Sequence, residues 1–328
     1  MERSTKNNTI QLLQNSLRPI AAYMDDPQVQ EIMINAPDNV WIERDGEVFK
    51  TDIRISEVEI RSAITLLAKM SGKDAKAGSE DSIIDARTDG FRIAAALAPV
   101  SVYGHSICIR KHSIRKLSLE DYLESGAIDQ PTYNLLLNIV LDRKAVIIAG
   151  GTSSGKTTFL NAMINKVPHH EVIRTVEDTH ELSITSPNWV AFEANPRAGV
   201  TIRSLVKLCL RYRPDRIILG EVRGGEAFDL IQAANTGHDG SFATLHANSA
   251  KAALSRLETL TMTAGIGWPL EAIRAEIGSA FNYVIFLSRM TVNGRTVRGI
   301  KEIVEVNGYD QASNEYRLKS LYERKHNA

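Results

Sequence analysis

Residues 150–157 constrain this chain more than any other stretch, because they read G-G-T-S-S-G-K-T and match the spacing G-x-x-x-x-G-K-T. An apolar run, 145–149, precedes them, and an amphipathic helical stretch, 158–163, follows. Gly150 and Gly155 permit backbone conformations closed to other residues and let the chain approach a ligand closely. The N–H groups of such a turn and the positive end of the next helix form a cradle for an anion. The stretch therefore predicts a site for nucleotide phosphates.

The residues of this loop have distinct expected tasks. Lys156 can reach the β- and γ-phosphates, and the Thr157 hydroxyl can ligate Mg²⁺. ATP and Mg²⁺ are therefore the expected cofactors. The expected nucleotide-binding residues are Gly150, Gly151, Thr152, Ser153, Ser154, Gly155, Lys156, Thr157 and Thr158.

Composition narrows the class of protein. The 328 residues suggest about two domains. Lys and Arg together number 39, as do Asp and Glu, so no net field draws the chain to nucleic acid or anionic lipid. Cys108 and Cys209 lie in apolar surroundings and are expected to be reduced and buried. We find no signal peptide and no run of about 18 apolar residues, so we expect a cytoplasmic protein, with peripheral attachment to the inner membrane face left open.

Two patterns divide the chain. Residues 1–111 combine short strand signals, two hairpin turns and a capped helix at 57–71, which predicts a smaller α+β domain. Residues 112–130 are polar and turn-prone, as in a linker or hinge. Residues 131–328 alternate apolar strands with helices, which predicts an α/β domain with a mostly parallel sheet covered on both faces. A final antiparallel set (283–287, 297–306 and 316–318) is expected at one edge of that sheet.

Two predicted strands end in acids that could act on the γ-phosphate. Strand 216–220 leads into Glu221, which could reach Mg²⁺ through a water or polarise the attacking water. Strand 172–177 ends in the cluster Glu177, Asp178 and Glu181, and a hydrolase needs a carboxylate at such an edge. A solvent-exposed acidic loop is the alternative for the cluster.

A histidine and several arginines complete the candidates. His246 follows strand 242–245 and could contact the γ-phosphate, although a structural histidine is equally compatible with its position. Guanidinium groups suit phosphate recognition, but each arginine alone also fits a surface ion pair. The candidate arginines are Arg87, Arg92, Arg110, Arg203, Arg211, Arg213, Arg216 and Arg223.

Four stretches, in this order, resemble the boxes of the hexameric ATPases of type II and type IV secretion, pilus retraction and conjugation. Residues 150–157 resemble the Walker A box, and V-E-D-T-H-E-L at 176–182 resembles the Asp box. R-P-D-R-I-I-L-G-E-V-R at 213–223 resembles Walker B, and T-G-H-D-G-S-F-A-T-L-H-A-N-S-A at 236–250 resembles the His box. The likeness runs over roughly 25–290 and is strongest to the type IV secretion and conjugal-transfer, TrbB-like, branch.

The resemblance implies a RecA-like P-loop NTPase domain and Mg²⁺-dependent ATP hydrolysis. It assigns catalysis to Glu181, the Walker B acid and metal contact to Glu221 with Thr157, and a place near the γ-phosphate to His246. The arginines it assigns to the nucleotide are Arg92, Arg110 and Arg213.

The resemblance also implies a ring of six identical chains, with ATP between the two domains and the linker as hinge. The expected partners are other components of a cell-envelope machine for type IV secretion, conjugative transfer or pilus assembly, and no sequence-specific binding of nucleic acid is expected. A pilus-retraction or type II secretion-like ATPase is the alternative, although the four-cysteine motif of some type II members is missing. A nucleic-acid-dependent RecA-like ATPase fits the balanced charge and 6% aromatic content poorly, and a kinase would need an acceptor pocket and a lid.

Overall fold

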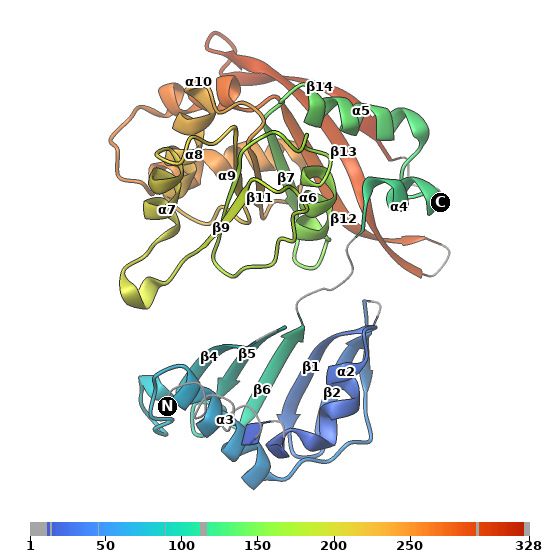
Figure 1. The fold of residues 1–328 in the computed structure, drawn as a ribbon, viewed down its shortest axis with the longest axis vertical. Coiled ribbons are helices and arrows are strands. Elements are labelled where there is room, and N and C mark those ends of the chain that lie inside the picture. Colours follow the sequence, from blue (N-terminus) through green and yellow to red (C-terminus); the bar gives the residue numbers. More distant parts are fainter. Residues whose placement is uncertain are drawn as a thin grey trace. The chain divides into compact units, whose positions relative to one another are not determined.

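The structure, a computed structural model, describes residues 12–13, 15–44, 46–88, 90–111, 117–292 and 295–324. The chain divides into two compact units, Met1–Ile114 and Arg115–Ala328. Each unit has its own sheet and its own buried core (Figure 1).

The first unit is an antiparallel sheet with the strand order β3-β2-β1-β6-β5-β4. Its strands are β1 (Val29–Ala36), β2 (Asn39–Arg44), β3 (Glu47–Lys50), β4 (Ile83–Thr88), β5 (Phe91–Ala96) and β6 (Ser106–Lys111). Its helices are η1 (Arg18–Ile20), α2 (Ala21–Asp25), α3 (Glu57–Met70) and η2 (Glu80–Ser82).

Helix α3 covers one face of this sheet. Ser56 and Glu59 form a reciprocal capping box at its start, so two backbone N–H groups of the first turn have acceptors. Its buried side chains, including Ile60, Ile64 and Leu67, meet the alternate strand residues that point to the same face. Because successive side chains of a strand point to opposite faces, the remaining strand residues point to the face of the sheet that is turned away from α3.

The second unit contains an eight-stranded mixed sheet with the order β14-β13-β12-β7-β11-β10-β8-β9. Its strands are β7 (Val146–Gly150), β8 (Ile173–Glu177), β9 (Trp189–Glu193), β10 (Arg216–Leu219), β11 (Phe242–Leu245), β12 (Tyr283–Val292), β13 (Arg295–Asp310) and β14 (Glu315–Glu323). The strands from β12 to β9 run parallel, and β13 and β14 extend one edge in antiparallel pairing. The mostly parallel sheet and the antiparallel set at one edge are therefore confirmed, and β12 joins them because it pairs antiparallel with β13 and parallel with β7.

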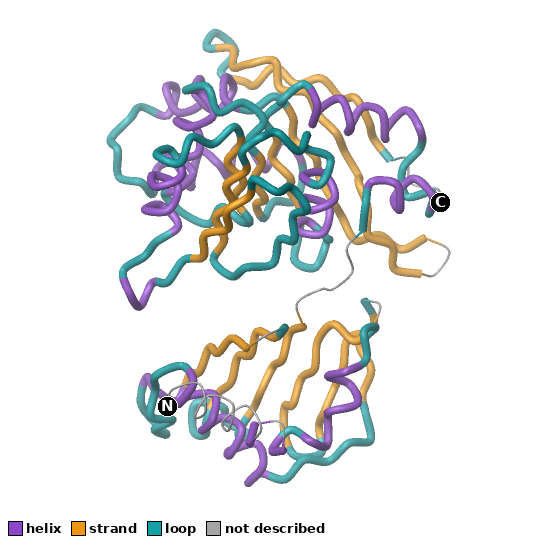
Figure 2. The backbone as a smooth tube through the Cα atoms, in the orientation of Figure 1, coloured by secondary structure: helices purple, strands orange, loops and turns teal. Residues whose placement is uncertain are grey.

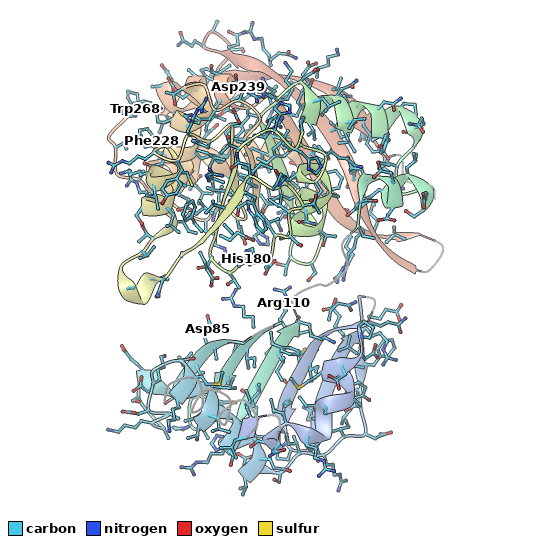
Figure 3. The ribbon with its side chains drawn as sticks, in the orientation of Figure 1. Asp85, Arg110, His180, Phe228, Asp239 and Trp268 are labelled. Atoms are coloured by element: carbon cyan, nitrogen blue, oxygen red, sulfur yellow. The ribbon has the colours of Figure 1, made fainter. Side chains whose placement is uncertain are left out.

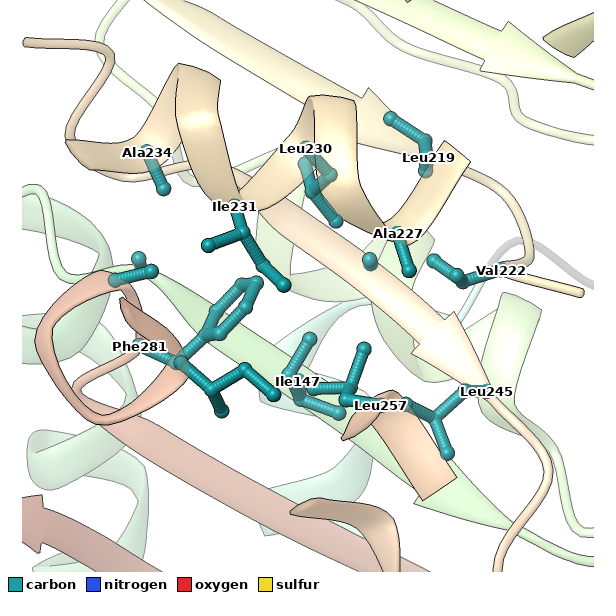
Figure 4. Close-up of a cluster of buried hydrophobic side chains, with 14 of the residues drawn as sticks. Ile147, Leu219, Val222, Ala227, Leu230, Ile231, Ala234, Leu245, Leu257 and Phe281 are labelled. Atoms are coloured by element: carbon teal, nitrogen blue, oxygen red, sulfur yellow. The ribbon is translucent and has the colours of Figure 1, made fainter. Parts of the chain in front are cut away.

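Helices cover both faces of this sheet (Figure 2). They are α4 (Leu119–Glu124), α5 (Gln130–Leu141), α6 (Lys156–Ile164), α7 (Ile202–Cys209), α8 (Glu226–Asn235), α9 (Ala250–Met262) and α10 (Leu270–Ala280), with the short η3 (Pro196–Ala198). In β7, Ile147 and Ala149 face the core formed with α7 to α10, whereas Val146 and Ile148 face the core formed with α4 to α6. Figure 4 shows the first of these cores, where Ile147 lies near Leu257 and Phe281.

Only the later part of the predicted linker, 112–130, can be described, and that part belongs to the second unit. Residues 112–116 lie outside the described residues. Beyond them α4 packs into the second unit, where Leu119, Tyr122 and Ile128 are buried against its core. The hinge itself stays a prediction. In the described ranges, no helix is both long enough and apolar enough to cross a membrane.

Candidate functional site

The loop between β7 and α6 has the backbone conformation that its glycines predict. Ser153 and Gly155 both have positive φ, at 57° and 91°. Gly150 leaves no space for a side chain, because a Cβ there would lie 2.5 Å from both the Leu287 carbonyl oxygen and Ser154 Oγ. The sequence therefore folds into a tight cradle that turns directly into the first turn of α6.

Lys156 lies inside this cradle. Its side chain is buried, and Nζ donates hydrogen bonds to the carbonyl oxygens of Gly150 at 3.1 Å and Gly151 at 2.9 Å. Ser154 Oγ is also buried and, in the described part of the chain, has no hydrogen-bond partner. A buried hydroxyl without an acceptor or donor fits a ligand oxygen in the cradle. Thr157 and Thr158 are half-buried in the first turn of α6, and Gly151 and Thr152 are exposed.

The candidate acids and His246 meet at the edge of the sheet that carries this loop. In the sheet, β7, β11, β10 and β8 are neighbours and run parallel. Their carboxyl ends therefore lie side by side, which is where ligands bind in open α/β sheets. His246 follows β11, Glu221 follows β10, and Glu177 ends β8.

Glu221 lies between a histidine and an arginine. Its Oε1 is 3.1 Å from His246 Nε2, and its Oε2 accepts a hydrogen bond from Arg223 Nη2 at 2.6 Å. Arg223 Nη1 also lies 3.6 Å from Asp178 Oδ2, so one guanidinium joins two of the strand-end acids. The sequence placed Arg223 only among the arginines around this strand, and its position two residues after Glu221 was the available signal.

Opposing effects set the charges of this group. Burial alone would raise the pKa of Glu221, but the hydrogen bond and charge of Arg223, with the charges of His246 and Lys156, hold that pKa below its usual value. Burial and the charge of Lys156 lower the pKa of His246, against the pull of Glu221. Glu221 is therefore ionised and His246 neutral at neutral pH.

The acidic cluster after β8 separates into two environments. Glu177 is buried, and its Oε1 accepts hydrogen bonds from the backbone N–H groups of Glu181 at 3.0 Å and Leu182 at 3.1 Å. Its Oε2 lies 3.0 Å from His180 Nδ1. Burial raises the pKa of Glu177. Glu181, by contrast, is exposed, and its backbone is held by Glu177.

Two of the candidate arginines lie away from this edge. Arg213 precedes β10, at the amino edge of the sheet, whereas Glu221 follows the same strand. Arg216 is fully buried and forms two hydrogen bonds to Glu171, at 2.6 and 3.1 Å. Figure 3 marks the two ends of this unit by His180, after β8, and Asp239, before β11. Within its own chain, Arg213 is thus not brought together with the phosphate loop.

Arg92 and Arg110 lie on the first unit. They are directly opposed on β5 and β6, and both point to the face of the sheet turned away from α3. Arg92 Nη2 is 3.3 Å from Asp85 Oδ2 on β4, and Figure 3 labels Asp85 and Arg110 on this sheet. Like charges opposed across strands cost stability, so the pair suits an anion.

The donors at this edge fit Mg²⁺ held with a nucleotide. No cluster of three or more potential ligands among His, Cys, Asp and Glu occurs in the part of the chain that the structure describes. Mg²⁺ in nucleotide sites takes few protein ligands and keeps phosphate oxygens and waters. The Thr157 hydroxyl, with Glu221 acting directly or through water, would supply that modest set.

Fold and site together define a P-loop nucleotide-binding protein of the α/β class. The model of the type II/IV secretion system protein family matches residues 13–317, so the chain belongs to that family.

Known proteins agree with this assignment. The conjugal transfer protein TrbB of Rhizobium radiobacter is 32% identical, over 94% of this chain and 93% of that protein. The type IV secretion system protein VirB11 of Bartonella quintana is 31% identical, over 87% and 91%. The X-ray structure of the Legionella pneumophila ATPase DotB shares the fold, with a TM-score of 0.63, 21% identity, and coverage of 85% of this chain and 78% of that chain. The predicted fold class and the predicted resemblance are confirmed.

Proposed function

We propose that this chain is a Mg²⁺-dependent ATPase that assembles into a ring of six and powers type IV secretion or conjugative transfer. The observation that carries the proposal is the convergence of the phosphate cradle, Glu221 and His246 at one edge of the sheet. Membership of the type II/IV secretion system protein family and the names of its TrbB and VirB11 relatives support the choice of machine.

Each residue of the site has a role in this proposal. The loop amides and Lys156 bind the β- and γ-phosphates, and Thr157 with Glu221 holds Mg²⁺, which stabilises the charge that develops on the transferred phosphoryl group. Glu181 orients and deprotonates the attacking water. Neutral His246 can donate a hydrogen bond from Nε2 toward a phosphate oxygen once its contact with Glu221 is released.

Arginines would complete the site from elsewhere. The opposed pair Arg92 and Arg110 offers two guanidinium groups to the γ-phosphate, so that hydrolysis would release a contact made by the first unit. Arg213, at the opposite sheet edge from its own phosphate loop, is proposed to act on the nucleotide of a neighbouring chain. We also propose that the chain binds other components of the cell-envelope machine at the cytoplasmic face of the inner membrane.

Two substitutions test the assignment. Lys156→Ala should abolish ATP hydrolysis and weaken nucleotide binding, because it removes the cation from the cradle. Glu181→Gln should leave ATP binding intact and reduce hydrolysis by about 100-fold or more, as expected for loss of a general base. Phosphate release and binding of a fluorescent ATP analogue would be measured for both.

The matched control is Lys319→Gln, an exposed residue on the edge strand β14, which should behave as wild type. Full activity in Glu181→Gln would remove that residue from the catalytic role, and full activity in Lys156→Ala would overturn the site. Strong stimulation by single-stranded DNA that disappears at high salt would instead favour a nucleic-acid-dependent ATPase.

A further inference from the structure

Arg223 contacts the acids of the site although neither the phosphate loop nor the strand-end pattern requires an arginine there. Its Nη2 donates to Glu221 Oε2 at 2.6 Å, and its Nη1 is 3.6 Å from Asp178 Oδ2. Its backbone is fixed as well, because Glu226 Oε1 accepts from the N–H groups of Arg223 at 2.6 Å and Gly224 at 2.8 Å. The turn after β10 thus holds the base of this side chain, and the side chain as a whole is 55% exposed.

Contacts within the chain engage the groups that a metal-bound nucleotide would need. Glu221 uses one oxygen toward Arg223 and the other toward His246. Lys156 Nζ is bonded to two carbonyl oxygens of its own loop. A short, charge-assisted hydrogen bond is about twice as strong as a neutral one, so Arg223 weakens the hold that a metal or a metal-bound water can gain on Glu221 Oε2.

We propose that Arg223 is a positioning residue that competes with Mg²⁺ for Glu221. In the chain without nucleotide, the guanidinium neutralises Glu221; when Mg²⁺ binds with the nucleotide, Arg223 exchanges Glu221 for Asp178. This inference rests on the proposed function, because it assigns the metal contact to Glu221.

Asp178 gives the exchange a second position for the cation. Its carboxylate already lies 3.6 Å from Arg223 and is partly exposed, so a rotation of the guanidinium replaces one carboxylate by another. The group formed by Glu221, Asp178 and Arg223 keeps the same net negative charge during this exchange, and the charge of Mg²⁺ is added to it. Loss of the Arg223–Glu221 contact, which is partly screened by solvent, is therefore the cost that Arg223 adds to Mg²⁺ binding.

The test is a Mg²⁺ titration of the binding of a fluorescent, non-hydrolysable ATP analogue, followed by anisotropy at a fixed protein concentration. Its midpoint is the Mg²⁺ concentration at which half of the Mg²⁺-dependent increase in binding is reached. Arg223→Gln should lower this midpoint by about 3- to 10-fold, because a hydrogen bond to a charged group that opposes the metal is removed. The midpoint of Arg223→Lys should lie between those of wild type and Arg223→Gln, because lysine keeps the positive charge but lacks the planar guanidinium group. Analogue binding in the presence of a chelator should not change.

Controls separate this role from a structural one. In the Glu221→Gln background, Arg223→Gln should cause no further shift, since the residue acts through Glu221. Lys319→Gln should leave the midpoint at the wild-type value. An unchanged or higher midpoint in Arg223→Gln, or an equal shift in both backgrounds, would overturn the inference alone. A wild-type chain that binds no analogue with or without Mg²⁺ would overturn the proposed function and this inference with it.

Discussion

Residues that are neighbours in sequence have opposite tasks in the loop after β8. Glu177 is buried and serves as an acceptor for the backbone of the next residues, whereas Glu181 is exposed to the solvent. An acidic cluster in a sequence therefore contains both an anchor and a candidate base. The burial of Glu177 follows from its place as the last residue of a strand that is buried on both faces.

Removing the anchor should loosen the loop that carries the candidate base. Glu177→Ala leaves two backbone N–H groups without their acceptor, and a buried unsatisfied donor costs about 1–3 kcal/mol. Amide hydrogen exchange over residues 178–184 should become at least about 10-fold faster in this variant. Glu181→Gln serves as control and should exchange as wild type. Equal exchange rates in the two variants would contradict the anchoring role.

The limit of prediction at the residue scale is illustrated by Arg213. The family resemblance assigned this residue to the nucleotide site, to which Glu221 also contributes. Strand β10 lies between the two residues, however, and a strand advances about 3.3 Å per residue. The two side chains therefore start from opposite edges of the sheet, a separation that sequence spacing alone does not reveal.

At the scale of elements, buried strands were predictable and their partners were not. Mostly apolar runs identify β7, β10 and β11, because parallel strands are covered on both faces. Strand β8 is buried as well, although it includes Arg174 and Thr175. The direction in which β12 pairs with β7 cannot be predicted from an apolar run, since a buried strand has the same apolar pattern in parallel and in antiparallel pairing. Helix α4 was missed within the polar linker, although Ser118 and Asp121 form a capping box that could have indicated it.

Helix α4 is tied to the second unit by a pH-sensitive ion pair. Lys166 Nζ and Tyr133 Oη both donate to Glu120 Oε1 at 2.6 Å, and these bonds lower the pKa of Glu120 to about 2. Because the folded pKa lies below the ordinary glutamate value, this stabilisation is complete above that value and is lost as the pH falls toward about 2.

Glu120→Gln should therefore reduce the free energy of unfolding by about 1 kcal/mol at pH 7, a value suited to a partly exposed pair. The difference from wild type should shrink as the pH falls from about 4.5 toward 2. Urea unfolding of both proteins at several pH values measures it, with the exposed Glu124→Gln on the same helix as control. A difference in free energy of unfolding between wild type and Glu120→Gln that stays constant with pH would contradict the role of ionised Glu120 in holding α4.

At the scale of the whole molecule, the chain contains a P-loop unit and a smaller sheet unit that carries two opposed arginines. The sequence predicts two domains because strands joined by hairpin turns in residues 1–111 give way to alternating strands and helices in residues 131–328. No pattern in one chain specifies how copies assemble, so the ring of six depends on family resemblance. Of the two proposed sources of arginine, the first unit and a neighbouring chain, the second makes activity depend on assembly.

The most direct measurement is the specific rate of ATP hydrolysis as protein concentration is raised, with the native mass determined in the same samples. We expect a six-subunit species, favoured by a non-hydrolysable ATP analogue, and a rate per chain that rises as this species forms. Mg²⁺ removal should abolish the rate at every concentration. A monomer whose rate per chain is independent of concentration would contradict the ring and the proposed action of Arg213 on a neighbouring chain.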